Sequence, residues 1–79
     1  MWHQGVIGAP IGGKMVACKY WVKAFEEASE EWGIDGGRIS KLSIMVNGEW
    51  TANYDRGWDI EPKDEATQIA LAILMMEYN

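Results

Sequence analysis

Apolar and polar residues alternate along two long stretches of the chain, and this alternation predicts a β-sheet. In the first stretch, Lys14 to Phe25, Lys19 and Lys23 lie on one side and an apolar set lies on the other: Val16, Cys18, Tyr20, Val22 and Ala24. A period of two among β-branched and aromatic residues favours a long strand. The good helix formers of "KAFEEASEEW" leave a helix over about 17–32 as the alternative.

The second stretch, "RISKLSIMV" at 38–46, places Leu42, Ile44 and Val46 on one face and ends at Asn47-Gly48. Asn-Gly between two alternating runs is a strong signal for a hairpin. We therefore expect a second and a third strand on either side of this turn.

The register of this hairpin can be argued from burial. A two-residue turn would pair Ile44 with Thr51 and set apolar residues opposite polar ones. A three-residue loop with a bulge at Gly48 would instead pair Ile44 with Trp50 and bring Ala52 and Tyr54 onto the same face. We expect the bulged loop, with Trp50 in the core.

The C-terminal segment predicts a helix over about 62–77, with Pro62 in its first turn. Ile69, Ile73 and Met76 form the apolar stripe expected to lie on the sheet. A second apolar stripe is turned away from the first and is the expected interface: Leu71, Leu74, Met75 and Tyr78. Either the N-terminal segment or another copy of the protein covers it, and we expect a homo-oligomer.

A short strand over 2–7 and a closing segment, "DRGWDIEP", complete the expected sheet. The prediction is one α+β domain over residues 1–79, with three to four antiparallel strands and one C-terminal helix packed on them. A chain of 79 residues buries a small core, which makes help from a partner subunit reasonable.

The charge of the chain excludes several classes of function. Twelve acidic residues against seven basic ones give a net charge of −5, which argues against general nucleic-acid or anionic-membrane binding. The N-terminus has no pattern of a signal peptide, and the apolar run "IALAILMM" is too short to span a bilayer. One cysteine, Cys18, permits no intramolecular disulfide, so we expect a cytoplasmic protein.

Several basic residues adjoin glycines, which is the pattern of an anion-binding loop. Lys14 follows Gly12-Gly13, Arg38 follows Gly36-Gly37, and Arg56 precedes Gly57. Glycine-rich backbone turns its N–H groups toward an anion while a cation supplies charge. The alternative is that these glycines form turns and the bases pair with Asp35, Asp55 and Asp59.

Tryptophans beside the glycine loops supply flat faces on which a base can stack. Trp32 and Trp58 are the candidates, and pairing of the strands is expected to bring Arg56 and Trp58 beside Arg38. The full set of expected ligand-binding residues is Lys14, Trp32, Asp35, Gly36, Gly37, Arg38, Lys41, Arg56 and Trp58.

No residue pattern indicates an enzyme. His3, the only histidine, has no acid nearby in sequence to orient it. Cys18 alternates with apolar neighbours, as a buried small side chain does. The sequence indicates neither a metal nor a cofactor.

The strings "GIDGGRISKL" at 33–42 and "YDRGWDIEP" at 54–62, followed by the amphipathic helix, resemble a family of short uncharacterised proteins of phages and prophages. The likeness covers roughly residues 20–79. It implies a protein made in the cytoplasm of an infected bacterium, where small phage proteins often counter host defence.

Two functions follow as expectations. In the first, a homo-oligomer without enzymatic activity sequesters a phosphorylated nucleotide signal. In the second, the protein inhibits a host defence protein, either through the acidic run "EEASEE" at 26–31 as a nucleic-acid mimic or through an exposed helix face.

Overall fold

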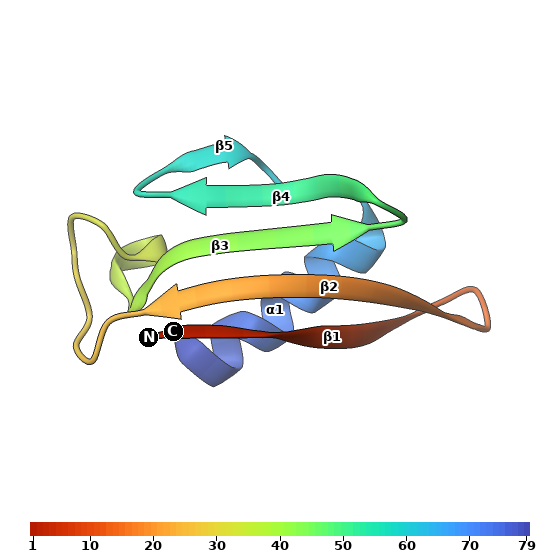
Figure 1. The fold of residues 1–79 in the computed structure, drawn as a ribbon, viewed down its shortest axis with the longest axis horizontal. Helices are drawn as coiled ribbons and strands as arrows, with labels where there is room; N and C mark the ends of the chain where they lie inside the picture. Colours follow the sequence, from red (N-terminus) through yellow and green to blue (C-terminus); the bar gives the residue numbers. More distant parts are fainter.

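A computed structural model describes residues 1–79 as one antiparallel sheet with a helix packed on one face (Figure 1). The strands lie in chain order across the sheet, β1-β2-β3-β4-β5, each joined to the next. The elements are β1 (Trp2–Ile11), β2 (Lys14–Ala24), a single 3₁₀ turn (Ile34–Gly36), β3 (Ile39–Val46), β4 (Glu49–Asp55), β5 (Trp58–Ile60) and α1 (Glu65–Tyr78). The expected α+β class with an antiparallel sheet is confirmed.

The sheet has five strands, not three to four. The N-terminal strand is longer than expected because it pairs with β2 along its whole length, from Trp2 opposite Lys23 to Ile11 opposite Lys14. The fifth strand forms because Arg56 and Gly57, both at positive φ, turn the chain back onto β4.

The alternation over 14–25 identified its strand correctly, and the helical alternative is wrong. β2 pairs with β1 on one side and β3 on the other, so its backbone groups are satisfied within the sheet. Cys18 and Val22 face the helix and are fully buried. Residues 26–31 form an irregular connection.

The β3–β4 hairpin differs from the expected register. Asn47 and Gly48, at φ 53° and 78°, form a two-residue turn that pairs Val46 with Glu49 and Met45 with Trp50. A bulge within β4 then brings Ala52 opposite Ile44. The extra residue therefore lies inside the strand instead of in the turn, and Trp50 moves to the face away from the helix.

The helix begins later and faces the other way than expected. Its N-cap is Asp64, whose side chain accepts a hydrogen bond from the backbone N–H of Thr67, so Pro62 precedes the helix. The residues buried against the sheet are Ala66, Thr67, Ala70 and Leu74. Small side chains at 66 and 70 let the helix approach the strands closely, which apolar periodicity alone did not reveal.

The expected interface stripe is therefore the packed one. Leu74 is fully buried, and Leu71, Met75 and Tyr78 pack against the core. The N-terminal strand helps to cover this stripe, with the ring of His3 stacked on Tyr78 at 4.8 Å between centroids. Two members of the stripe expected on the sheet are outside instead, because Met76 is 89 % exposed and Ile73 is 39 % exposed. The third, Ile69, is half-buried and packs against the core as expected.

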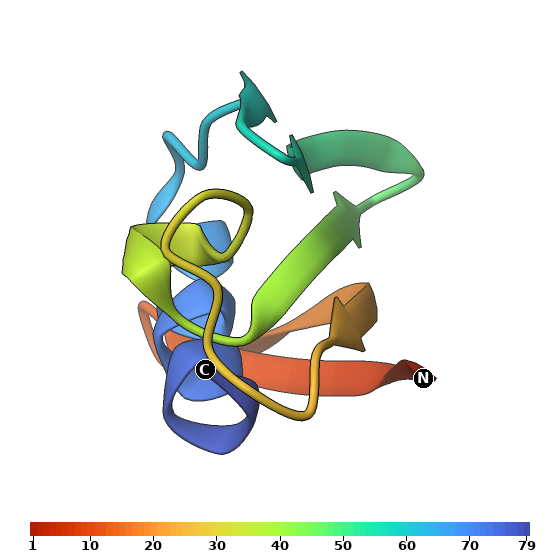
Figure 2. The same ribbon diagram turned by 90° about the vertical axis from the view of Figure 1, so that its left-hand side faces the viewer.

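The core lies between the helix and one face of the sheet, and the second face has no covering layer (Figure 2). We call this second face the open face. Alternation along each strand sends Ile44, Leu42 and Val22 into the core and their neighbours in sequence onto the open face.

Candidate functional site

The glycine loop that was expected to bind an anion uses its backbone N–H groups in hydrogen bonds within the loop. The N–H of Gly36 donates to the carbonyl of Gly33 at 3.1 Å, and that of Gly37 donates to the carbonyl of Ile34 at 2.9 Å. Neither group is free to contact a ligand. The alternative of a structural turn describes this backbone better.

Arg38 contributes to the end of the helix. Its Nε donates to the carbonyl oxygen of Tyr78 at 3.1 Å, where the helix leaves carbonyls without an internal partner. A cation at this position also interacts favourably with the helix dipole. The guanidinium is thus oriented by the helix terminus.

Trp32, Arg56 and Trp58 gather around Tyr54. The Tyr54 hydroxyl donates to the carbonyl of Trp32 at 3.2 Å, and Trp58 packs edge-on against the Tyr54 ring at 5.1 Å. The Arg56 guanidinium lies over the indole of Trp32, 5.2 Å from its centroid. This is a cation–π contact at the surface.

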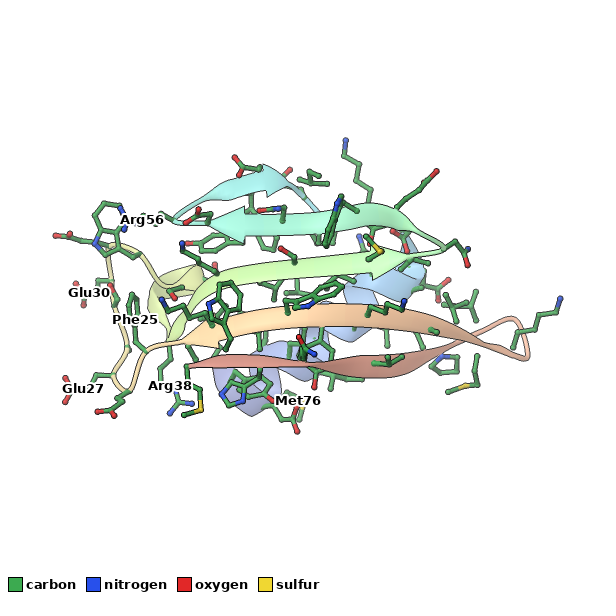
Figure 3. The ribbon with its side chains drawn as sticks, in the orientation of Figure 1. Phe25, Glu27, Glu30, Arg38, Arg56 and Met76 are labelled. Atoms are coloured by element: carbon green, nitrogen blue, oxygen red, sulfur yellow. The ribbon has the colours of Figure 1, made fainter.

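The expected meeting of Arg56 and Trp58 with Arg38 is not found. Figure 3 shows Arg38 and Arg56 on opposite sides of the connection between β2 and β3. Lys14 is farther still, because it follows the β1–β2 turn at the other end of the sheet. Asp35 is exposed at φ 50°. The expected set is therefore divided among several places.

The open face carries a second set of polar and aromatic residues, only one of which, Lys41, belonged to the expected site. The strand register places Lys19 beside Met45 and Trp50, and Trp21 beside Ser43 and Asn53. Within β1–β4 this face holds three lysines, Lys19, Lys23 and Lys41, and one carboxylate, Asp55, at its edge. This local excess of positive charge contrasts with the chain's net −5.

Two tryptophans meet above β3 on this face. Trp21 extends from β2 and Trp50 from β4, and their ring centroids are 5.4 Å apart at an interplanar angle of 58°. Trp50 is 50 % exposed, so much of its ring remains available to solvent. The pair forms a fixed aromatic surface in the middle of the sheet.

Two lysines lie directly opposite each other next to the tryptophans. Lys23 on β2 and Lys41 on β3 are cross-strand partners, and like charges in this position destabilise a sheet. Only Lys41 has an acidic partner, Asp55, at 3.9 Å. One such exposed contact compensates the repulsion weakly.

Two shallow hollows flank Lys19 on the same face. One, of about 230 Å³, is lined by Gln4, Val6 and Trp21. The other, of about 240 Å³, is lined by Ala17, Met45 and Asn47. Both are smaller than a pocket that encloses a drug-sized molecule, so a ligand here would lie across the face.

The sequence alone indicated part of the residue set on the open face. Lys19, Trp21 and Lys23 share one phase of the alternation in β2, opposite to the buried phase. Trp50 could not be added, because its side of the sheet depends on whether the extra residue of the hairpin lies in the turn or, as found, after Trp50 inside β4.

The remaining reactive groups are structural. The Cys18 thiol is buried and contacts the carbonyls of Val16 and Ala66, and burial together with the charge of Asp64 raises its pKa. His3 is stacked on Tyr78. No group of three or more histidine, cysteine or acidic side chains is placed to hold a metal ion. The one α-helix is too short and polar to cross a membrane.

A family model of a domain of unknown function, DUF7678, matches residues 1–79. The chain belongs to this family. No curated protein and no solved structure is significantly similar to it. Membership in DUF7678 assigns no activity.

Proposed function

We propose that this protein is a non-enzymatic binding protein whose open face holds a phosphorylated nucleotide. The observation that carries the proposal is the cross-strand pair Lys23–Lys41 beside the tilted pair of indoles Trp21–Trp50. One pair offers charge for phosphate and the other a flat surface for a base.

The lysine pair favours an anionic ligand for an energetic reason. Two ammonium groups held opposite each other repel, and the repulsion is relieved when an anion lies between them. A phosphate carries the charge for this and accepts hydrogen bonds from both groups. Lys19 lies on the same face of β2, four residues before Lys23, and extends the positive surface past Trp21.

The tryptophan pair favours a base as the other part of the ligand. Stacking on an exposed aromatic ring is tolerant of base identity, since every base has a π-face. Contact between the two indoles restricts their rotation, so less conformational freedom is lost on binding. Ser43 and Asn53, on the cross-strand row of Trp21, add hydrogen-bonding groups.

The resemblance to phage proteins gives this binding a setting. A small protein that binds a cyclic or ADP-ribose-type nucleotide without changing it would lower the free concentration of a host signal. Sequestration of that kind needs affinity and abundance, and it needs no catalytic group.

Calorimetry and tryptophan fluorescence test the proposal. The native protein is titrated with ADP-ribose and cyclic di-AMP, with inorganic phosphate as the comparison for charge alone. We expect at least one nucleotide to bind and to change the emission of Trp21 and Trp50. Failure of the native protein to bind any phosphorylated nucleotide in a wider panel would contradict the proposal.

A matched pair of double variants separates the site from overall charge. Lys23→Gln with Lys41→Gln removes two positive charges from the open face, and we expect about a tenfold or greater loss of affinity, or about 1.4 kcal/mol. Lys14→Gln with Lys63→Gln removes the same charge elsewhere and should bind as the native protein does. Equal losses in both would mean that net charge, and no local site, governs binding.

An inhibitor of a host protein is the second candidate, because Glu26, Glu27, Glu30 and Glu31 are all exposed on one connection, next to Phe25, which is 38 % exposed. Figure 3 shows Phe25, Glu27 and Glu30 projecting from the same end of the molecule. Carboxylates around an aromatic side chain suit a basic partner surface. Neutralising the four glutamates should abolish partner capture and leave nucleotide binding unchanged.

A further inference from the structure

We propose that two copies of this protein pair through the outer edge of β1 to form a two-fold dimer with a continuous ten-stranded sheet. The dimer also buries the two exposed apolar side chains of α1, Ile73 and Met76. Two independent features of the molecule point to the same partner, a second copy of the chain.

The first feature is the long edge strand β1, which has only Pro10 near its end to block pairing. β1 runs for ten residues as an edge strand, and residues 1–13 contain no charged side chain. Proteins usually shield such edges with charges, bulges or very short strands. The opposite edge is shielded in this way, because β5 has three residues and one of them is Asp59.

The register of the β1–β2 hairpin shows which backbone N–H and C=O groups of β1 have no partner in β2. Gly12 and Gly13, both at positive φ, form a two-residue turn closed by Ile11 and Lys14. In such a hairpin the closing pair is hydrogen-bonded, so alternate residues of β1 bond to β2 and the others point their N–H and C=O groups outward. The outward residues are Trp2, Gln4, Val6, Gly8 and Pro10.

Pro10 supports this assignment of outward residues, because proline has no N–H group and is found where the sheet needs none.

The four outward residues that keep an N–H group define the pairing. A two-fold axis at Gly5 sets Trp2 opposite the partner's Gly8 and Gln4 opposite the partner's Val6. This antiparallel register uses all four residues, and the absent side chain of glycine leaves room for the indole of Trp2.

The second feature is the helix beside this edge. The C-terminal half of α1 lies under the start of β1, and Figure 3 shows Met76 beyond the outer side of β1. Met76 is 89 % exposed and Ile73 is 39 % exposed. With the axis at Gly5, the two helices lie close together beneath the sheet, and these side chains face their counterparts.

Charge also favours this contact over others. Two chains of net charge −5 repel each other, and a contact surface without charge adds nothing to this repulsion. Residues 1–13, which contain the β1 edge, are the longest stretch of the chain without a charged side chain. The pairing also joins the two open faces on one side of the dimer, next to the hollows lined by Gln4 and Val6.

Sedimentation of the protein without ligand tests the dimer separately from nucleotide binding. We expect twice the chain mass of 8.9 kDa. Val6→Pro removes an outward N–H and leaves the bonds to β2 intact, and Met76→Lys places a charge in the helix contact; each should weaken the dimer at least about tenfold. Ile60→Lys makes the same change in charge at the opposite edge and should sediment as the native dimer.

Amide hydrogen exchange of the native protein gives a result that needs no variant. The amides of Gln4, Val6 and Gly8 should become protected as the protein concentration rises. A native protein that stays monomeric at its solubility limit overturns the proposal. So does a dimer that survives Met76→Lys with these amides unprotected, or one that is lost on Ile60→Lys.

Discussion

The side chain of Asn79 is hydrogen-bonded to the backbone of Ile39, with Oδ1 accepting from the N–H at 3.0 Å. Its Nδ2 also donates to the carbonyl of Ile34 at 3.0 Å. One side chain after the helix thereby fixes the segment that leads into β3. The glycine loop is therefore held by contacts within the chain.

Replacing this side chain should destabilise the fold. Asn79→Ala removes both hydrogen bonds and leaves partly buried backbone groups unpaired, at a cost of about 1–3 kcal/mol. Asn79→Asp keeps the acceptor and loses the donor, so its free energy of unfolding should fall between those of the native protein and Asn79→Ala. Chemical denaturation measures the series. A native-like stability for Asn79→Ala would contradict this role.

Three glycines of the same loop should respond to alanine in a fixed order. At Gly33 a Cβ would overlap the backbone carbonyl of Gly37, which cannot rotate away, so we expect a loss of several kcal/mol. At Gly37 it would overlap the side chain of Asn79, which can move by giving up its hydrogen bonds, at about 2 kcal/mol. At Gly36 a Cβ would meet only Glu30 at an ordinary contact distance, but the backbone φ of +74° disfavours a side chain, and we expect a loss of about 1 kcal/mol. Thermal unfolding of the three variants gives the order, and a largest loss at Gly36 would contradict it.

The N-cap of the helix predicts a dependence of stability on pH. Burial acts to raise the pKa of Asp64, but hydrogen bonds from the hydroxyl and backbone N–H of Thr67 lower it below the ordinary 3.8. A depressed pKa in the folded state stabilises the protein above 3.8, and this contribution disappears as the pH falls through the folded pKa. We expect Asp64→Asn to be less stable than the native protein at neutral pH.

The difference between the two proteins should shrink as the pH is lowered from about 5 to below the ordinary pKa of a carboxyl group. Thermal unfolding at a series of pH values measures it, and Glu61→Gln, a change of the same charge just before the helix, is the control. A constant difference across this range would show that the charge of Asp64 contributes nothing to the cap.

The two faces of the sheet should differ in their sensitivity to truncation. Trp50→Ala removes a half-exposed ring and should cost about 1 kcal/mol, mainly its contact with Trp21. Leu74→Ala opens a cavity in the core and should cost about 2–5 kcal/mol. The register expected from sequence, with Trp50 buried, gives the reverse order. Urea denaturation of both variants distinguishes the two registers.

Local patterns predicted the elements well, because alternation and turn residues act over a few positions. The strand at 14–24, the Asn47-Gly48 turn and the C-terminal helix all follow from such signals. Which side of each element is buried was less predictable. Two stripes of α1 have similar apolarity, and the choice between them depends on how closely Ala66 and Ala70 let the helix approach the strands.

The candidate site was hard to predict for a related reason. The basic residues beside the glycines were visible in sequence. Their positions depend on tertiary contacts, however: Arg38 is held by Tyr78 and lies apart from Arg56. The pairing of Lys23 with Lys41 follows from the register of β2 with β3, two strands separated by a long irregular connection. No sequence signal sets that register.

The buried thiol gives a last test of the packing between sheet and helix. Cys18 is fully buried beneath α1, and burial together with the charge of Asp64 raises its pKa, so little thiolate is present at neutral pH. A disulfide reagent should therefore modify the native protein only when the helix lifts or the chain unfolds. Leu74→Ala, which loosens this contact, should raise the modification rate in proportion to the population of the open state. Met15→Ala, a change at an exposed residue of the same strand, should leave the rate unchanged. Rapid modification of the native thiol would contradict the packing of α1 over β2.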